Sequence, residues 1–141
     1  MNEEILNQVY KNAHVALQSI SNVLPETENT AMKDELMREY DGYEKIIGEI
    51  SEYMAKKNYQ PKDINPMKKA MLFTSIKMNA LGDDSKSHIA EMMVKGTVMG
   101  ICELRRLISE HKFSVDAEVT EFAKKLLSLE EGYEETLKSM L

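Results

Sequence analysis

The sequence predicts an all-α protein whose main body is a bundle of four long helices. Apolar residues recur three and four positions apart along four long segments, and this spacing gives each helix one continuous apolar face. No segment keeps the alternation of apolar and polar residues that marks a half-buried strand for more than a few residues. Only three prolines and six glycines interrupt the 141 residues, so we expect one domain over residues 1–141.

The first hairpin is predicted from two helices at the start of the sequence. The first helix covers residues 2–23 and ends before Pro25, because proline disfavours the helical conformation of the residue before it. The second helix begins near residues 27–30 and continues to about residue 57. The connection between them is short, so the two helices should pack antiparallel.

The apolar stripe of the second helix contains Tyr40 and Tyr43 and is broadened by Met37. A buried tyrosine hydroxyl needs a hydrogen-bond partner. We therefore expect polar atoms inside the bundle, supplied by glutamates that flank the stripes or by His14.

A short third helix is predicted over residues 66–81. Asn65 as N-cap, with Pro66 at the first helical position, marks its start. Gly82 can adopt the left-handed conformation that ends many helices. The segment that contains this helix is long enough to run the length of a bundle.

The second hairpin is predicted from the last two long helices. The fourth helix begins near residues 83–85, which offer several N-caps, and runs to about residue 112. The fifth helix begins after Ser114 or Asp116, either of which can cap it. The connection is again short, so this pair should also pack antiparallel.

Two helical hairpins joined by a long helical crossover in a chain of this length resemble the small bacterial ferritin-like proteins, including their uncharacterised and spore-coat-associated branches. The resemblance implies a ferritin-like four-helix bundle with one long crossover that contains the short helix. The best-known members bind two irons with glutamates and two Glu-x-x-His motifs. The sequence contains no Glu-x-x-His, and the nearest approach is the reversed His88-x-x-Glu91, so the two-iron ligand motif is absent.

Four polar residues beside the apolar stripes could still converge on a metal ion: His14, Glu39, Glu103 and Glu130. The interpretation that we favour is that these acidic side chains lie at the boundary between core and water. No cofactor and no catalytic residue is therefore expected, and iron is the alternative. Cys102, next to Ile101 on the fourth helix, is expected to be a small buried thiol.

Methionines and glycines mark a candidate interface on the third and fourth helices. The sequence contains 11 methionines, whose flexible thioethers fill gaps and also suit adaptable binding surfaces. Two helix-interior glycines four positions apart favour close approach of another helix, from the same chain or from a second copy. The candidate interface residues are Met67, Met71, Met78, Met92, Met93, Gly96 and Gly100.

These observations predict a non-catalytic bundle that acts in self-assembly, as a dimer, or in binding a protein partner. A net charge of -6 disfavours nucleic acid as a partner. The single cysteine, the missing secretory signal and the missing apolar span predict a cytoplasmic protein without a membrane span. Two alternatives remain: a metal-binding oxidase or peroxidase with atypical ligands, and a small-molecule sensor with an apolar cavity under the methionines.

Overall fold

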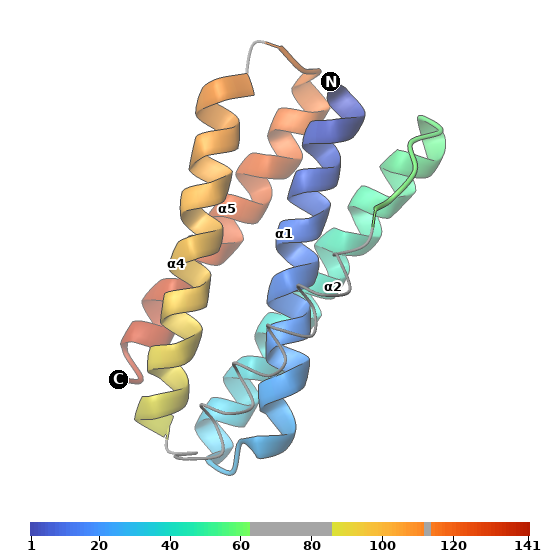
Figure 1. Ribbon diagram of the computed structural model, residues 1–141. Helices are drawn as coiled ribbons and strands as arrows, with labels where there is room; N and C mark the ends of the chain where they lie inside the picture. The colour runs from blue at the N-terminus through green and yellow to red at the C-terminus, as the bar shows by residue number, and fades with distance from the viewer. Residues whose placement is uncertain (63–85, 112–113) are drawn as a thin grey trace.

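The computed structural model describes residues 1–62, 86–111 and 114–141. These residues form four long helices and no strand, which confirms the predicted all-α class (Figure 1). The elements are α1 (Asn2–Val23), a 3-10 turn η1 (Leu24–Glu26), α2 (Thr30–Lys56), α4 (Lys86–His111) and α5 (Ala117–Lys138). The predicted third helix at residues 66–81 lies outside the described residues, together with its flanking Asn65 and Gly82 and with Met67, Met71 and Met78.

The helix ends follow local signals in the sequence. Pro25 lies in the turn η1, directly after α1. Asn29 caps α2, because its side chain accepts a hydrogen bond from the backbone N–H of Met32 at 2.9 Å. Asn58 ends α2 in the left-handed region, with φ of 58°. Asp116, rather than Ser114, is the residue that precedes α5.

Hydrogen bonds near the N-terminus fix the directions of the helices. The backbone N–H of Asp116 donates to Asn2 Oδ1 at 2.8 Å, so α1 and α5 begin at the same end of the bundle. Asn7 bonds the backbone of Gln60 and Lys62 at 3.0 and 2.7 Å, so the chain beyond α2 returns to that end. Therefore α1 runs antiparallel to α2 and parallel to α5, while α2 and α4 run parallel to each other (Figure 1).

The core lies where the four apolar stripes meet. Its largest fully buried side chains include Leu6, Ile20, Leu36, Ile50, Leu104 and Leu126. In α2 the buried positions are spaced three and four apart and include Glu39 and Tyr43. Successive residues of a helix point about 100° apart, so Met37, which follows the buried Leu36, falls off this stripe.

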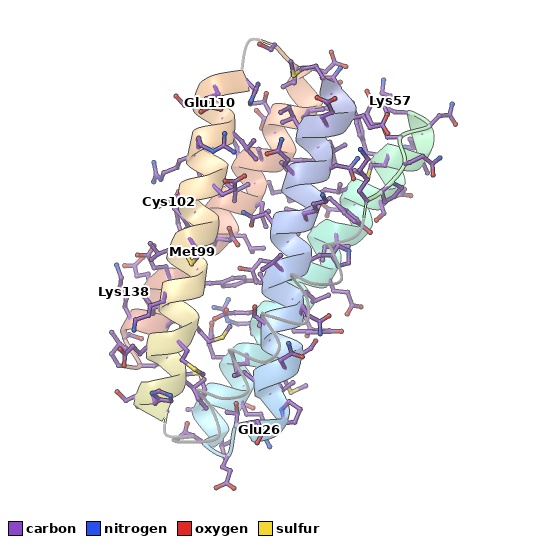
Figure 2. The ribbon with its side chains drawn as sticks, viewed as in Figure 1. Glu26, Lys57, Met99, Cys102, Glu110 and Lys138 are labelled. Carbon is purple, nitrogen blue, oxygen red and sulfur yellow. The ribbon has the colours of Figure 1, made fainter. Side chains whose placement is uncertain are left out.

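Two core assignments from the sequence are therefore corrected. Met37 is exposed, whereas Tyr40 is half-buried and packs against the core. Cys102 is exposed instead of buried, because it follows the buried Ile101 and points to a different side of α4. Figure 2 shows Cys102 at the outer edge of this helix.

Candidate functional site

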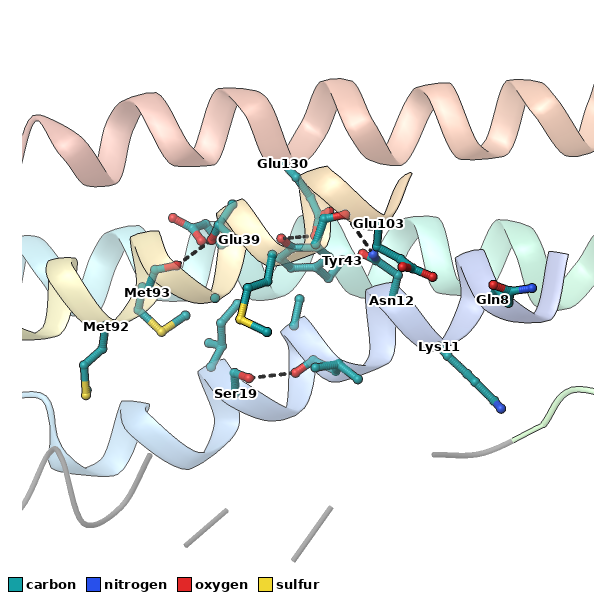
Figure 3. A pocket seen from close by; sticks show the side chains of 17 residues that line it. Gln8, Lys11, Asn12, Ser19, Glu39, Tyr43, Met92, Met93, Glu103 and Glu130 are labelled. Carbon is teal, nitrogen blue, oxygen red and sulfur yellow. Dashed lines mark hydrogen bonds between the residues drawn. The ribbon is translucent and has the colours of Figure 1, made fainter. Parts of the chain in front are cut away.

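A partly open pocket with a volume of about 550 Å³ lies between α1 and α4 (Figure 3). Side chains from α2 and α5 also line it. Its apolar lining comes from both walls and comprises Val15, Ala16, Ile20, Met92, Met93 and Met99. Its polar lining includes three carboxyl groups, those of Glu39, Glu103 and Glu130.

Glu130 places a carboxyl group of α5 in the interior, where its exposed fraction is 1%. The hydroxyl of Tyr43 donates a hydrogen bond to Glu130 Oε2 at 3.1 Å. Glu130 Oε1 has no hydrogen-bond partner within the described residues. Burial favours the neutral acid and raises the pKa of Glu130 to about 8, although the hydrogen bond from Tyr43 opposes this shift. Glu130 is therefore mostly protonated at neutral pH.

Glu39 brings a second carboxyl group into the interior from α2, and its exposed fraction is also 1%. Burial, followed by a hydrogen bond to Glu35, raises the pKa of Glu39 to about 10. Burial also favours neutral Glu35, but two hydrogen bonds from Arg38, at 2.8 and 2.9 Å, outweigh it and lower the pKa of Glu35. Glu39 is thus a neutral acid that donates to an ionised neighbour.

The second oxygen of Glu39 remains unpaired. In the described part of the chain, Glu39 Oε2 is buried and accepts no hydrogen bond. Asn12 adds a third such atom from α1: its Nδ2 donates to the carbonyl oxygen of Gly100 at 3.1 Å, while its Oδ1 is buried without a partner. Asn12, Glu39 and Glu130 all line the pocket.

Gly100 makes room for the buried acid of α5. A Cβ atom at position 100 would lie 2.9 Å from Glu130 Oε1 and 3.0 Å from Oε2. The close approach predicted for this glycine is therefore to a side chain of the same chain. Gly96 differs, because a Cβ atom there would meet no atom within 4 Å.

The candidate metal ligands do not all come together. Glu39, Glu103 and Glu130 line one pocket, whereas His14 does not line it and packs against Tyr10 with ring centroids 4.5 Å apart. His88 and Glu91 also lie outside the pocket lining, and Glu91 forms an ion pair with Lys95 at 3.1 Å. Among the residues described, no group of three or more His, Cys, Asp or Glu side chains could hold a metal ion.

The favoured interpretation of the acidic residues as solvated flanks is wrong for Glu39 and Glu130. Both side chains point inward because their helices place them on the same face as the core residues. The interpretation is confirmed for Glu103, which is partly exposed and bonds Arg106 at 3.0 Å. A glutamate beside an apolar stripe was predicted as a hydrogen-bond partner for a buried tyrosine, and the hydrogen bond from Tyr43 to Glu130 confirms this prediction.

Four of the candidate interface residues line this pocket: Met92, Met93, Gly96 and Gly100. Met99, also in the lining, is 74% exposed. The ion pair between Glu35 and Arg38, which lies next to Glu39, was not predicted from the sequence. Their spacing of three along α2 is the signal that could have found it.

The four helices described form a bundle with a pocket between α1 and α4, and two buried acids are among its lining residues. No protein-family model, curated protein or solved structure matches the chain. None of the helices described has the length and apolar composition that crossing a membrane requires.

Proposed function

We propose that this protein is a non-catalytic helical bundle that binds a small organic molecule in the pocket between α1 and α4. One observation carries the proposal: apolar side chains and a few polar residues, among them Asn12, Glu39 and Glu130, line the same 550 Å³ pocket. Ligand pockets of about 300–1,000 Å³ are typical, with mostly apolar walls and a few polar groups that orient the ligand. The site matches that description, and its methionines can adapt to the shape of a ligand.

The parallel directions of α2 and α4 support a ferritin-like connection as part of this proposal. Since α2 ends near the start of α1, the segment that follows must reach the opposite end of the bundle before α4 begins. A single long crossover of this kind distinguishes ferritin-like bundles from up-down-up-down bundles. We propose that residues 57–85 form it.

Self-assembly through α4 is a second candidate function. The observation that favours it is a local apolar surface: Met99 is 74% exposed, Val98 is also exposed, and Gly96 beside them leaves open space. Sedimentation analysis of the wild-type protein and of Met99→Glu tests this function. A dimer that dissociates in the variant would support assembly, whereas a monomeric wild-type protein would rule it out.

Iron binding with atypical ligands is the remaining alternative, supported by the three glutamates of the pocket. It would require ionised carboxylates, and burial keeps Glu39 and Glu130 neutral before a cation binds. Metal content measured after anaerobic Fe(II) addition and desalting tests it. Retention of about two irons per chain, as in a two-iron bundle, would replace the small-molecule proposal.

The test of the proposed function is binding of the neutral fluorophore N-phenyl-1-naphthylamine. Gly96→Phe adds a large apolar side chain to the lining, where a Cβ atom meets nothing within 4 Å. Gly48→Phe is the matched control, because Gly48 is also a helix-interior glycine with open space but does not line the pocket. We expect fluorescence to rise with the wild-type protein and the control, and at least tenfold weaker binding by Gly96→Phe. Equal binding by all three proteins would refute the proposal.

A further inference from the structure

We infer that the outward face of α4 binds the same face of a second copy of this chain, as an antiparallel pair of helices centred on Met99. The inference rests on self-assembly, the second candidate function above, and specifies the partner, its orientation and the register of the contact. It does not depend on whether the pocket binds a small molecule.

The core residues of α4 determine which of its residues point outward. Thr97 is buried, and at about 100° per residue Met99 points roughly 160° away from it. Between Met92 and Arg106, the residues that fall within about 60° of the direction of Met99 form the outward face. They are Met92, Lys95, Gly96, Met99, Cys102, Glu103 and Arg106.

The centre of the outward face is apolar, small and exposed. The side chain of Met99 is 74% exposed, and Cys102 is exposed as well (Figure 2). A Cβ atom at Gly96 would meet no described atom within 4 Å, although a helix-interior glycine costs about 1 kcal/mol relative to alanine. The buried acid that explains Gly100 thus has no counterpart at Gly96. Close approach of a second helix supplies a reason for this glycine.

The charges on this face complement one another across a two-fold axis. In a symmetric pair, a contact between two different residues occurs twice, once in each direction. If the helices run antiparallel with Met99 on the axis, residues equally far before and after Met99 lie at the same level. Lys95 precedes Met99 by four positions and Glu103 follows it by four. Lys95 therefore lies level with the partner's Glu103, and two ion pairs form.

The opposite orientation would bring like charges together. In a parallel pair of the same face, each residue lies level with its own copy. Lys95 would then face the partner's Lys95, and Glu103 would face the partner's Glu103. Juxtaposed like charges are unfavourable and exclude wrong arrangements. The charge pattern of α4 therefore selects the antiparallel pair.

Each intermolecular ion pair joins two ion pairs that already exist within the chains. Lys95 contacts Glu91 at 3.1 Å, and Glu103 contacts Arg106 at 3.0 Å. Isolated exposed pairs contribute little, whereas a network of several charges contributes more. The dimer would contain two networks of alternating sign, each running from Glu91 and Lys95 to the partner's Glu103 and the partner's Arg106. The contact is only one helix wide, so the dimer should be weak and reversible.

The experiment is disulfide trapping under mild oxidation by oxidised glutathione. Met92 precedes Met99 by seven positions and Arg106 follows it by seven. Met92→Cys and Arg106→Cys are each made together with Cys102→Ser, so each chain carries one thiol. In the inferred pair, the two copies of position 92 lie roughly 21 Å apart along the axis, too far for a disulfide. Position 92 is level with the partner's position 106. We therefore expect a disulfide dimer only when the two variants are mixed.

A third cysteine variant measures random collision. Lys124→Cys, also with Cys102→Ser, lies on α5, where the Lys124 side chain is 56% exposed against 47% for Arg106. The mixture of Met92→Cys and Arg106→Cys should form disulfides at least tenfold faster than Met92→Cys mixed with Lys124→Cys. Circular dichroism verifies that all three variants keep their helices.

Exchange of the two charges tests the ion pairs separately. Lys95→Glu in both trapping variants places a glutamate level with the partner's Glu103 and should slow the disulfide at least fivefold. Glu103→Lys in the same chains restores opposite charges and should return the rate to within twofold. If this second change does not restore the rate, Lys95 and the partner's Glu103 do not meet and the register is wrong.

The outcomes also separate this inference from both candidate functions. Disulfides formed by Met92→Cys alone and by Arg106→Cys alone would show a parallel pair and overturn the inference. A dimer in sedimentation analysis without trapping in any mixture would place self-assembly on another face and overturn the inference alone. A monomeric wild-type protein without trapping would overturn self-assembly as well. Binding of N-phenyl-1-naphthylamine is measured independently, so the small-molecule proposal would stand in each of these cases if the fluorophore binds.

Discussion

Replacing Glu130 by Gln should change how the stability of the protein depends on pH. Burial raises the pKa of Glu130 from 4.5 to about 8. Between these values the folded protein holds a proton that the unfolded chain has lost, so the free energy of unfolding falls as the pH rises. Below pH 4.5 both states are protonated and the loss is absent. Above about pH 8 both are ionised and the loss is complete.

The magnitude follows from the size of this shift. One pKa unit corresponds to about 1.4 kcal/mol, so the wild-type protein should lose about 3 kcal/mol from this group between pH 4.5 and 7. The amide of Glu130→Gln carries no proton that titrates in this range. The stability of the variant relative to the wild-type protein should therefore increase by about 1.4 kcal/mol for each pH unit.

Urea denaturation followed by circular dichroism at pH 5, 6 and 7 measures this difference. The slope with pH is the informative quantity, because the amide also leaves one buried atom unpaired and shifts all values by a constant amount. Glu121→Gln, on the exposed side of α5, should parallel the wild-type protein. If the stability difference between Glu130→Gln and the wild-type protein stays constant from pH 5 to 7, Glu130 is ionised in the folded protein and our reasoning is refuted.

Three further predictions concern the surroundings of this acid and the exposed thiol. Tyr43→Phe removes the hydroxyl that donates to Glu130 and should cost about 1–3 kcal/mol in urea denaturation. Gly100→Ala places a Cβ atom 2.9 Å from Glu130 Oε1 and should lower the melting temperature, whereas Gly96→Ala meets open space and should gain about 1 kcal/mol. Iodoacetamide should alkylate Cys102 in the folded protein without loss of helicity; protection until unfolding would contradict its exposure.

The two buried acids lower the stability of the bundle instead of adding to it. An unpaired buried polar atom costs about 1–3 kcal/mol, and a well-packed apolar side chain could replace it. Glu39 and Glu130 therefore lower the stability of the unliganded bundle.

Local patterns determined most of the secondary structure. The predicted range 2–23 coincides with α1, because Pro25 acts on the residues directly before it. The start of α2 was predicted to within a few residues, where Asn29 provides the cap. These signals depend on a few neighbouring residues, so the sequence alone is sufficient to find them.

The sequence did not determine which polar residues lie inside. Glu39, Glu103 and Glu130 occupy similar positions beside their apolar stripes, yet the first and last are buried and the second is partly exposed. Adjacent residues of a helix point about 100° apart. The spacing of the apolar residues therefore does not show whether a polar residue at the edge of the stripe faces the core or the solvent.

The sequence by itself determined the all-α class, the helix bounds and the need for a polar partner inside the core, because proline, capping residues and helical periodicity act locally. The tertiary structure alone decided that this partner is Glu130, that Gly100 makes space for it, and that Glu39 and Asn12 face the same pocket. These relations join four helices that are far apart in the sequence. They depend on how each helix is rotated against its neighbours, and packing of the whole core sets those rotations.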